Sequence, residues 1–284
     1  MILLDGKRLA GRIKEEVKED VSKIAFEGRR VCLAVIQVGS DPASSVYVRN
    51  KKNACDYVGI ESMVINLDEG VTTGELIECI DELNHDDMVH GILVQLPLPK
   101  RIDECAILRS IAPEKDVDGF HEMNVGKLVI GREGVVPCTA AGIIKLLVDN
   151  DIEIEGKHCV VVGRSDIVGK PTAMELLHHN GTVTICHSKT RGLKDVCKTA
   201  DILICAIGKP KFFNRDYVRP GAVVVDVGIH RQKNGTLCGD VDFDDVKDIV
   251  SAITPVPGGV GPMTVAMLLR NCVGVGRRKD KETC

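Results

Sequence analysis

A tyrosine and a lysine stand four positions apart, as Tyr47 and Lys51, within a segment whose pattern predicts a helix over 44–57. Side chains at this spacing project from one face of a helix, so a ring and an amine would be presented together. A lysine amine can accept or relay a proton when burial or a neighbouring cation favours its neutral form. The same spacing is also common on solvated helix faces, so the pair alone leaves a catalytic and a surface role open.

Two other polar side chains lie where strands of a parallel sheet are expected to end. Gln95 closes the apolar run GILVQ at 91–95, and Asp118 lies in the turn KDVDG at 115–119. Open α/β sheets bind ligands beyond the carboxyl ends of their strands. A strand-terminal amide and a turn aspartate also occur for purely structural reasons. The loop PVPGGVGP at 255–262 also has two possible roles: its backbone could approach a flat ligand closely, or it could be only a rigid connector.

A strand-to-helix turn carries small residues at Gly163, Ser165 and Gly169. It follows the apolar run CVVV, which is where a Rossmann-type fold binds a dinucleotide pyrophosphate. The turn departs from G-x-G-x-x-G, because Ser165 replaces the second glycine and Gly169 comes one residue late. An ordinary glycine-containing turn is the alternative interpretation.

The next predicted strand ends in HSKTR at 187–191, a run of hydroxyl and basic groups. An NAD site expects an acidic residue about 20 residues beyond the glycines to hold the ribose. No acidic residue occurs in this run, whereas Ser188 and Arg164 suit the additional 2'-phosphate of NADP. The sequence therefore favours NADP over NAD, with a solvated loop as the alternative.

Strand and helix patterns alternate along the chain and predict parallel sheets covered by helices. The first series places strands at 31–38, 63–67 and 91–96, and helices at 9–21, 44–57 and 74–83. The second places strands at 159–162, 183–186, 202–206 and 222–227, and helices at 141–148, 172–178 and 265–272. Glycine and charge become locally frequent before residue 135, so we expect the domain junction there.

The composition agrees with a soluble protein of two domains. The chain has 284 residues, and its 44% hydrophobic and 27% charged content is typical of globular proteins. A net charge of -4 argues against a nucleic-acid partner, and no apolar run is long enough to span a membrane. Twelve cysteines are scattered without a C-x-x-C pair, which indicates small buried residues in a reducing, cytoplasmic setting.

Several of these segments, in this order, closely resemble the bifunctional methylenetetrahydrofolate dehydrogenase/cyclohydrolase family, called FolD in bacteria. The matching motifs are DPASSVYVRNKKNAC at 41–55, GILVQLPLP at 91–99, KDVDGFHEMNVGKL at 115–128, VVVGRSDIVGKP at 160–171, CHSKT at 186–190 and PVPGGVGPMT at 255–264. One departure is PCTAAG at 137–142, which has alanine where the family commonly has proline.

The resemblance implies two α/β domains with a cleft between them. Residues 1–135 would form a folate-binding catalytic domain, and residues 136–262 a Rossmann-type NADP-binding domain. A C-terminal helix at 263–284 would pack back on the first domain. A homodimer is the usual assembly in the family.

The resemblance also implies a role for individual residues. Lys51 would be the catalytic lysine, Tyr47 would stack on the folate, Gln95 would hydrogen-bond Lys51, and Asp118 would anchor the pterin. Further folate contacts would be Val94, Leu96, Pro257, Gly258, Gly259, Val260 and Gly261. The NADP contacts would be Gly163, Arg164, Ser165, Val168, Gly169, Ser188, Ile229 and Thr264. No metal is expected.

The implied activity has two steps: NADP-dependent oxidation of 5,10-methylenetetrahydrofolate to the methenyl cation, then hydrolysis to 10-formyltetrahydrofolate. Positioning of the two rings should dominate the first step, because it requires no proton acceptor. Proton transfer enters in the second, where Gln95 would orient Lys51 without adding an opposing charge. The alternatives are a dehydrogenase without the hydrolytic step and a non-catalytic sensor of NADP or folate.

Overall fold

The computed structural model describes residues 1–279, which form two compact α/β units. One unit contains residues 1–11 and 137–264, and the other contains residues 12–136 together with the described residues from 265 to 279. This division differs from the predicted 1–135 and 136–262 at the N-terminus. Residues 1–11 join the later segment because β1 (Ile2–Leu3) pairs in parallel with β11 (Ala252–Ile253). Helices α1 (Gly6–Phe26) and α10 (Val260–Lys279) each have residues in both units.

The helix predicted at 263–284 is therefore α10, which begins three residues earlier than expected and is helical through Lys279. The last five positions of that prediction lie outside the described residues.

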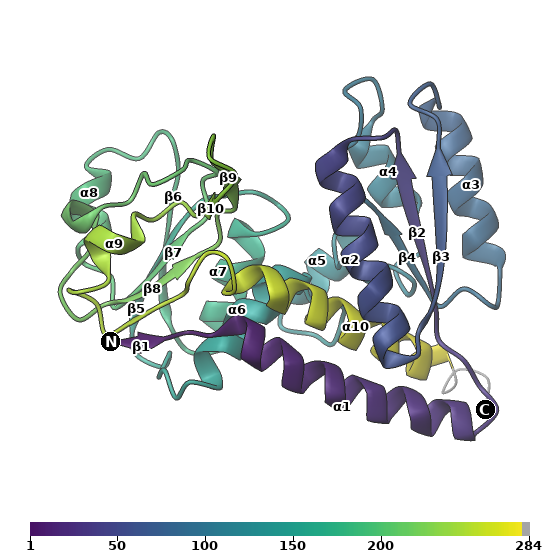
Figure 1. Ribbon diagram of the computed structural model, residues 1–284, viewed down its shortest axis with the longest axis horizontal. Helices are drawn as coiled ribbons and strands as arrows, with labels where there is room; N and C mark the ends of the chain where they lie inside the picture. The colour runs from purple at the N-terminus through teal and green to yellow at the C-terminus, as the bar shows by residue number, and fades with distance from the viewer. Residues whose placement is uncertain (280–284) are drawn as a thin grey trace. The chain divides into compact units, whose positions relative to one another are not determined.

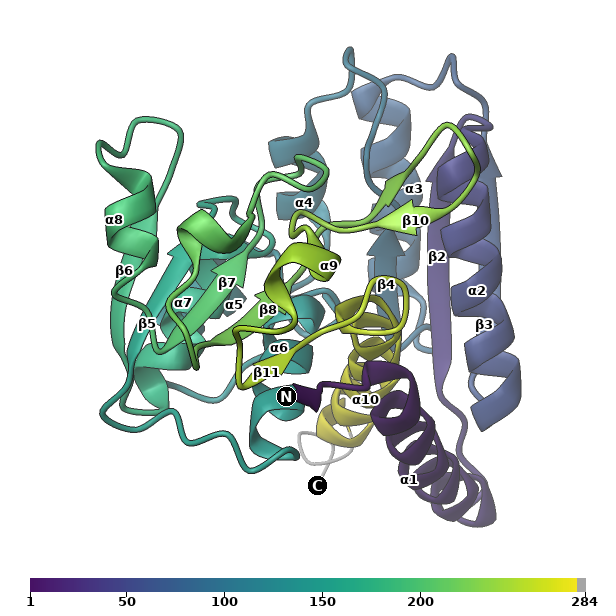
Figure 2. The same cartoon turned by 60° about the vertical axis from the view of Figure 1, so that its left-hand side comes forward.

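A six-stranded sheet organises the unit of residues 1–11 and 137–264, in the order β1-β11-β8-β7-β5-β6 (Figure 2). Its longer strands are β5 (His158–Val162), β6 (Thr182–Cys186), β7 (Ile202–Cys205) and β8 (Val223–Asp226). Every pairing in this sheet is parallel, so all carboxyl ends lie along one edge. From β5 the chain goes to β6 on one side and then to β7 on the other. The ligand crevice of such a sheet lies where the strand order reverses, which here is between the loops after β5 and β7.

Short elements complete this unit and account for most of the differences from the predicted pattern. Helices α6 (Cys138–Val148) and α7 (Gly169–His178) were predicted. The elements that were not predicted are the two-residue strands β1 and β11, helix α8 (Leu193–Cys197), the 3-10 turn η1 (Arg215–Tyr217), helix α9 (Phe243–Val246) and the hairpin of β9 (His230–Arg231) and β10 (Leu237–Cys238). Elements of two to five residues have no measurable periodicity. They are held by a core that includes the fully buried Phe213, Leu203 and Val224.

A three-stranded parallel sheet in the order β3-β2-β4 organises the other unit. Its strands are β2 (Cys32–Val38), β3 (Glu61–Leu67) and β4 (Gly91–Val94), and its helices after α1 are α2 (Pro42–Val58), α3 (Thr73–His85), α4 (Glu104–Ser110) and α5 (Glu122–Val129) (Figure 1). Every residue of β2 is buried, which explains why Gln37 is its only polar residue. Ile36, Ile80 and Ile92 pack in the core between this sheet and α3.

The described cysteines agree with the expectation of small buried residues. Nine of the eleven are buried, Cys79 is half-buried and Cys105 is exposed; Cys284 lies outside the described residues. Burial raises the pKa of Cys55 and of Cys197 to about 12, so both remain neutral thiols at physiological pH.

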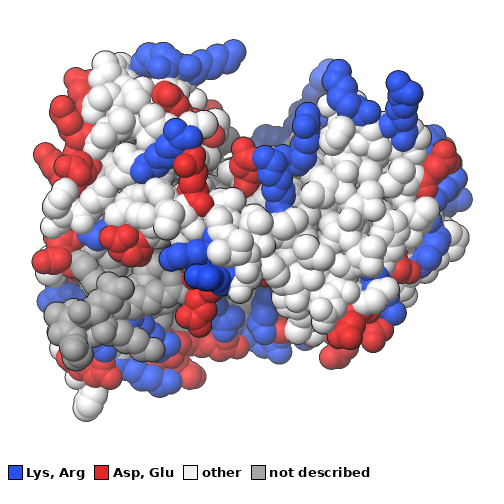
Figure 3. Space-filling model, turned by 180° about the vertical axis from the view of Figure 1, so that it is seen from behind, with Lys and Arg blue, Asp and Glu red and all other residues white. Residues whose placement is uncertain are grey.

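The surface carries charges of both signs. On the face shown in Figure 3, side chains of both signs border a broad uncharged area, and several Lys and Arg side chains follow one another along its upper edge. Among residues 1–279, no helix has both the length and the apolar composition that a bilayer crossing requires. In the same part of the chain, no group of three or more His, Cys, Asp or Glu side chains is arranged to hold a metal ion.

Candidate functional site

Helix α2 is fixed at its start, close to the carboxyl end of β2. The Asp41 carboxylate accepts a hydrogen bond from the Ser44 amide at 2.7 Å, and Pro42 occupies the first turn. The buried Gln37 of β2 donates through Nε2 to Ser45 Oγ at 2.9 Å. These bonds set where the third turn of the helix, and therefore Lys51, lies relative to the sheet.

Lys51 and Gln95 meet, although 44 residues separate them in sequence. Lys51 Nζ donates to Gln95 Oε1 at 3.0 Å. The Gln95 side chain is itself oriented, because its Nε2 donates to the Leu96 carbonyl oxygen at 2.6 Å. Its backbone amide donates to the Ile36 oxygen at 2.8 Å, which continues the sheet by one position. The Gln95 amide oxygen therefore faces the Lys51 amine just beyond the end of β4, whose last residue is the buried Val94.

The neighbouring lysine has a different environment. Lys52 pairs with Asp56 at 3.1 Å, and both side chains are about half exposed. Lys51 is partly buried, whereas the Tyr47 ring, one turn earlier, is 44% exposed. Lys52 therefore lies on the solvated face of α2, whereas the Lys51 amine contacts Gln95 at the end of the sheet.

The loop that carries Asp118 is attached to the edge of β4. Ile92 and Asp116 form a parallel bridge, so the chain carries Asp118 toward the same end of the sheet as Gln95. Lys115 is 4% exposed, and its Nζ donates to the Leu83 and Asp86 carbonyl oxygens, each at 2.8 Å. A buried amine thereby satisfies carbonyls at the carboxyl end of α3 and holds the start of the loop. Asp118 itself is partly exposed.

The Asp116 carboxylate organises the rest of this loop, and sequence reasoning did not identify it. It is 2% exposed and accepts three hydrogen bonds at 2.9 Å, from the Gly119 amide, the His121 amide and Asn124 Nδ2. Asn124 lies in α5, so the carboxylate connects the turn to the helix that follows. Asp116 therefore positions Asp118 without being exposed to a ligand.

The turn between β5 and α7 brings the strand and the helix unusually close together. A Cβ on Gly163 would lie 2.3 Å from the Ala206 carbonyl oxygen, and one on Gly169 would lie 2.3 Å from the Gly163 oxygen. The Ser165 hydroxyl accepts from the Val168 and Gly169 amides at 3.2 and 3.3 Å. Although the sequence of the turn departs from G-x-G-x-x-G, both glycines are required for this close approach. The N-terminal end of α7, which carries the positive end of the helix dipole, faces the turn.

Arg164 and Ser188 follow neighbouring strand ends. Val162 of β5 is paired with Cys186 of β6, and the Gly163 amide donates to the Cys186 oxygen at 2.9 Å. Both Arg164 and Ser188 are exposed, and no acidic residue occurs from 182 to 194. A guanidinium and a hydroxyl suit a phosphate group, and the one acidic side chain in the turn, Asp166, is paired with Lys170.

The predicted loop at 257–261 lies in the same unit as this turn. Gly258 has a φ of 109°, and a Cβ on Gly259 would lie 2.6 Å from the Pro255 carbonyl oxygen, so glycine is required at both positions. A Cβ on Gly261 would lie 3.1 Å from Ile229 Cδ1, which places two predicted contact residues beside each other. Val260 begins α10, where the Thr264 and Thr139 hydroxyl oxygens lie 3.1 Å apart.

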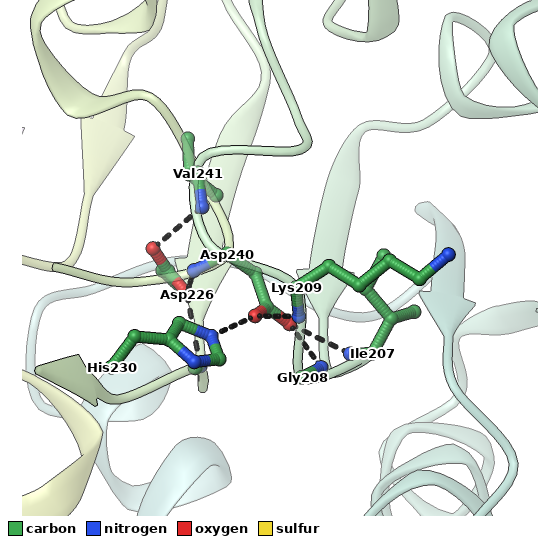
Figure 4. Close-up of polar contacts among 8 residues, drawn as sticks. Ile207, Gly208, Lys209, Asp226, His230, Asp240 and Val241 are labelled. Atoms are coloured by element: carbon green, nitrogen blue, oxygen red, sulfur yellow. Dashed lines mark hydrogen bonds and ion pairs between the residues drawn. The ribbon is translucent and has the colours of Figure 1, made fainter. Parts of the chain in front are cut away.

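Two buried carboxylates lie behind these loops, and neither was singled out from the sequence (Figure 4). Asp240 has no exposed surface and accepts from the amides of Ile207, Gly208 and Lys209 at 2.7, 3.0 and 2.9 Å. Asp226, at the end of β8, accepts from the amides of Gly228, Asp240 and Val241 at 2.8 to 3.0 Å. In the sequence, Asp240 directly follows Gly239 and Asp226 stands two residues before Gly228, which is the only local signal of these carboxylates. In the structure, a Cβ on Gly239 would lie 1.8 Å from Asp226 Oδ2, so glycine is required there.

Asp226 makes stability depend on pH in a defined direction. Burial raises the pKa of Asp226 to about 6, with a smaller contribution from the nearby Asp240, although three amides favour the charged form. The folded state then binds a proton more tightly than the unfolded state, so stability falls as pH rises from about 4 through about 6. Asp226→Asn removes this titrating group. We therefore expect the difference in unfolding free energy between the wild type and this variant to fall by about 2–3 kcal/mol from pH 4 to pH 7. Urea denaturation at four pH values measures this difference; a rise, or no change, would contradict it.

Comparison with known families accounts for both units. Residues 4–118 match the catalytic domain, and residues 137–280 the NAD(P)-binding domain, of tetrahydrofolate dehydrogenase/cyclohydrolase. The chain belongs to this family. The predicted recognition is thereby confirmed over nearly the whole chain.

Individual relatives are similar over their full lengths. The bifunctional protein FolD of Lachnoclostridium phytofermentans is 61% identical, with 96% of each chain covered. The crystal structure of the bifunctional enzyme FolD from Campylobacter jejuni is 51% identical, with a TM-score of 0.97 over 98% of this chain and 99% of that one. The Trypanosoma brucei dehydrogenase-cyclohydrolase, solved with NADP and an inhibitor, is 38% identical, with a TM-score of 0.94 over 99% of each chain.

These similarities confirm the predicted fold class and enzyme. The protein has two α/β domains, one of them an NADP-binding domain, and it is a bifunctional methylenetetrahydrofolate dehydrogenase and methenyltetrahydrofolate cyclohydrolase. Its cofactor is NADP. The side chains fit that cofactor, because Arg164 and Ser188 are exposed beside a glycine turn at the N-terminus of α7.

Proposed function

We propose that Lys51 is the catalytic residue of the cyclohydrolase step and that Gln95 holds it in place. The observation that supports this assignment is the hydrogen bond of 3.0 Å from Lys51 Nζ to an amide whose own orientation is fixed. An uncharged acceptor orients the amine without stabilising its ammonium form as a carboxylate would. Removing Lys51 tests the assignment directly, because the two activities can be measured separately.

In the dehydrogenase step, this chain mainly binds and orients the reactants. NADP, when bound, accepts a hydride from the methylene carbon, which leaves the methenyl cation. We propose that Tyr47 stacks on the folate ring through its exposed face and that Asp118 bonds the pterin. The remaining proposed folate contacts are Val94, Leu96 and the loop Pro257, Gly258, Gly259, Val260 and Gly261. Orientation is the dominant contribution to such a step, because the protein removes no proton.

In the hydrolytic step, a water oxygen bonds to the methenyl carbon and the carbon–N5 bond breaks. One proton of the water is transferred to N5, and the other is released to solvent. The Lys51 amine takes that proton from the attacking water or relays it, and Gln95 keeps the amine in position throughout. Proton transfer by a positioned side chain contributes roughly 10²- to 10⁴-fold to a rate.

We propose that NADP is held by the turn at Gly163, Ser165, Val168 and Gly169, by Ile229 and Thr264, and by Arg164 and Ser188 at its 2'-phosphate. Replacing Arg164 with alanine should raise the KM for NADP+ about tenfold or more and change that for NAD+ little, because NAD+ lacks the phosphate. Steady-state dehydrogenase assays with each cofactor measure both constants. Lys170→Ala, which removes an exposed cation paired with Asp166, is the matched control. Equal rises for both cofactors would show that Arg164 does not read the phosphate.

The Lys51–Gln95 pair also bears on the competing functions. A dehydrogenase without the hydrolytic step has no need of an oriented amine, and a sensor has no need of either reaction. Purified protein, incubated with methylenetetrahydrofolate and NADP+ and followed at the absorbance of both products, separates these cases. Formation of NADPH together with 10-formyltetrahydrofolate is the expected result, whereas accumulation of methenyltetrahydrofolate alone would refute the bifunctional assignment.

We propose further that the protein is a cytoplasmic homodimer with folate as its partner ligand. The support is the family's usual assembly and the set of buried free cysteines, which a reducing compartment preserves. Sedimentation equilibrium tests the assembly: a particle mass twice the chain mass of 30.8 kDa is expected, and a monomer would refute it.

A further inference from the structure

The loop after β7, residues 206–209, borders the dinucleotide turn. The Ala206 amide donates to the Val162 oxygen at 2.9 Å, and the Ala206 oxygen is the atom that a Cβ on Gly163 would meet at 2.3 Å. Because β5 and β7 lie on either side of the reversal in strand order, this loop forms the second wall of the expected ligand crevice. Its conformation therefore helps to decide whether a dinucleotide fits.

One buried carboxylate holds this wall. Three consecutive amides, of Ile207, Gly208 and Lys209, donate to Asp240. Successive amides that converge in this way form a concave anion site. Here the protein's own carboxylate fills that site, and the positive φ of Gly208, 69°, allows the chain to curve around it. Three backbone donors are held by one carboxylate that has no exposed surface, and this fixes the conformation of the loop.

The same carboxylate also restrains the segment after β8. His230 Nε2 lies 2.8 Å from Asp240 Oδ1, and His230 directly follows Ile229 (Figure 4). The Asp226 carboxylate at the end of β8 in turn accepts from the Asp240 amide at 2.8 Å and from the Gly228 amide at 3.0 Å. Asp240 thus connects the loops that follow two adjacent central strands.

We propose that Asp240 is a positioning residue for the dinucleotide, although it does not touch the cofactor. By fixing residues 207–209 and the segment that carries Ile229, it keeps two walls of the crevice in their binding conformation. This inference rests on the NADP site proposed above. It assigns Asp240 to the dehydrogenase step alone, because hydrolysis of methenyltetrahydrofolate consumes no NADP.

Asp240→Asn tests the proposal. The amide has nearly the shape of the carboxylate, but it loses the charge and places an NH2 group against backbone donors. We expect the Kd for NADP+, measured by isothermal titration calorimetry, to rise about tenfold or more, as the loss of charge-assisted bonds to a binding loop predicts. The kcat and KM of the cyclohydrolase, assayed without NADP+, should stay within about twofold of wild type.

The matched control is Asp244→Asn, which removes a carboxylate four residues later whose side chain is 79% exposed. Its Kd for NADP+ and both activities should equal those of wild type. An Asp240→Asn protein with a wild-type Kd, or one that loses binding and hydrolysis in parallel, would overturn the proposal.

His230→Ala provides an independent test, and it decides the matter if Asp240→Asn does not fold. It leaves the three amide bonds in place and removes only the connection to the Ile229 segment, so a smaller rise in Kd, roughly threefold, is expected with hydrolysis unchanged. A wild-type Kd in this variant would refute the role. The wild type is assayed first: failure to bind NADP+ there would refute the proposed site itself rather than the role of Asp240.

Discussion

Replacing Lys51 with methionine will abolish hydrolysis of methenyltetrahydrofolate, while part of the dehydrogenase activity survives. Methionine keeps an unbranched side chain of similar length but cannot accept or relay a proton. We expect the cyclohydrolase kcat to fall by about 10²- to 10³-fold, within the range attributed to a positioned acid or base. The dehydrogenase should lose less, because hydride transfer requires no proton acceptor and depends on the orientation of two rings.

Lys52→Met is the matched control for this experiment. It removes the adjacent amine, which pairs with Asp56 and does not contact Gln95 in any described hydrogen bond. Both activities of Lys52→Met should remain near those of wild type. The absorbance decay of methenyltetrahydrofolate measures hydrolysis without any contribution from NADP. A Lys51→Met enzyme that hydrolyses this substrate at the wild-type rate would show that another group moves the proton.

Replacing Asp116 with alanine will destabilise the protein strongly. The substitution removes the common acceptor of the Gly119 and His121 amides in the turn and of the Asn124 side chain in α5, all of which are buried or half-buried. An unsatisfied buried donor costs about 1–3 kcal/mol, so we expect a loss of about 3–5 kcal/mol in unfolding free energy. The KM for folate in the surviving protein should rise, because the turn also carries Asp118.

Glu114→Ala is the control for this second experiment. Glu114 is an exposed carboxylate two residues earlier in the same loop, and its removal should change the unfolding free energy by less than about 0.5 kcal/mol. Urea denaturation monitored by circular dichroism measures both variants. A loss of under about 1 kcal/mol in Asp116→Ala would mean that the turn finds other acceptors, and that Asp116 does not position Asp118.

The long strands could be predicted because a strand that is buried on both faces consists almost entirely of apolar residues. The run VCLAVIQV became β2, whose residues are all buried, and the predicted runs at 159–162 and 202–206 became the central strands β5 and β7. Helices α4 and α5 could not be predicted in the same way. With seven and eight residues, they are about two turns long, and no apolar stripe repeats often enough to be recognised.

The chemistry of the NADP site could also be inferred locally. The hydroxyl and basic groups stand directly after β6, and in a parallel sheet with known strand order the loops after neighbouring strands must lie together. The position of Gly169, one residue later than in the usual fingerprint, did not matter, because close approach of backbones needs only the absence of a Cβ.

What the sequence by itself determined was the succession of strands and helices, the residue types at each strand end and, through its motifs, the family. Only the tertiary structure decided which distant residues meet. Ile2 pairs with Ala252, which lies 250 positions later in the sequence. Lys51 donates to Gln95, and Asp240 accepts from the amides of residues 207–209. The reason is physical: a buried polar group must find a partner, but nothing in its neighbouring residues says which segment supplies it.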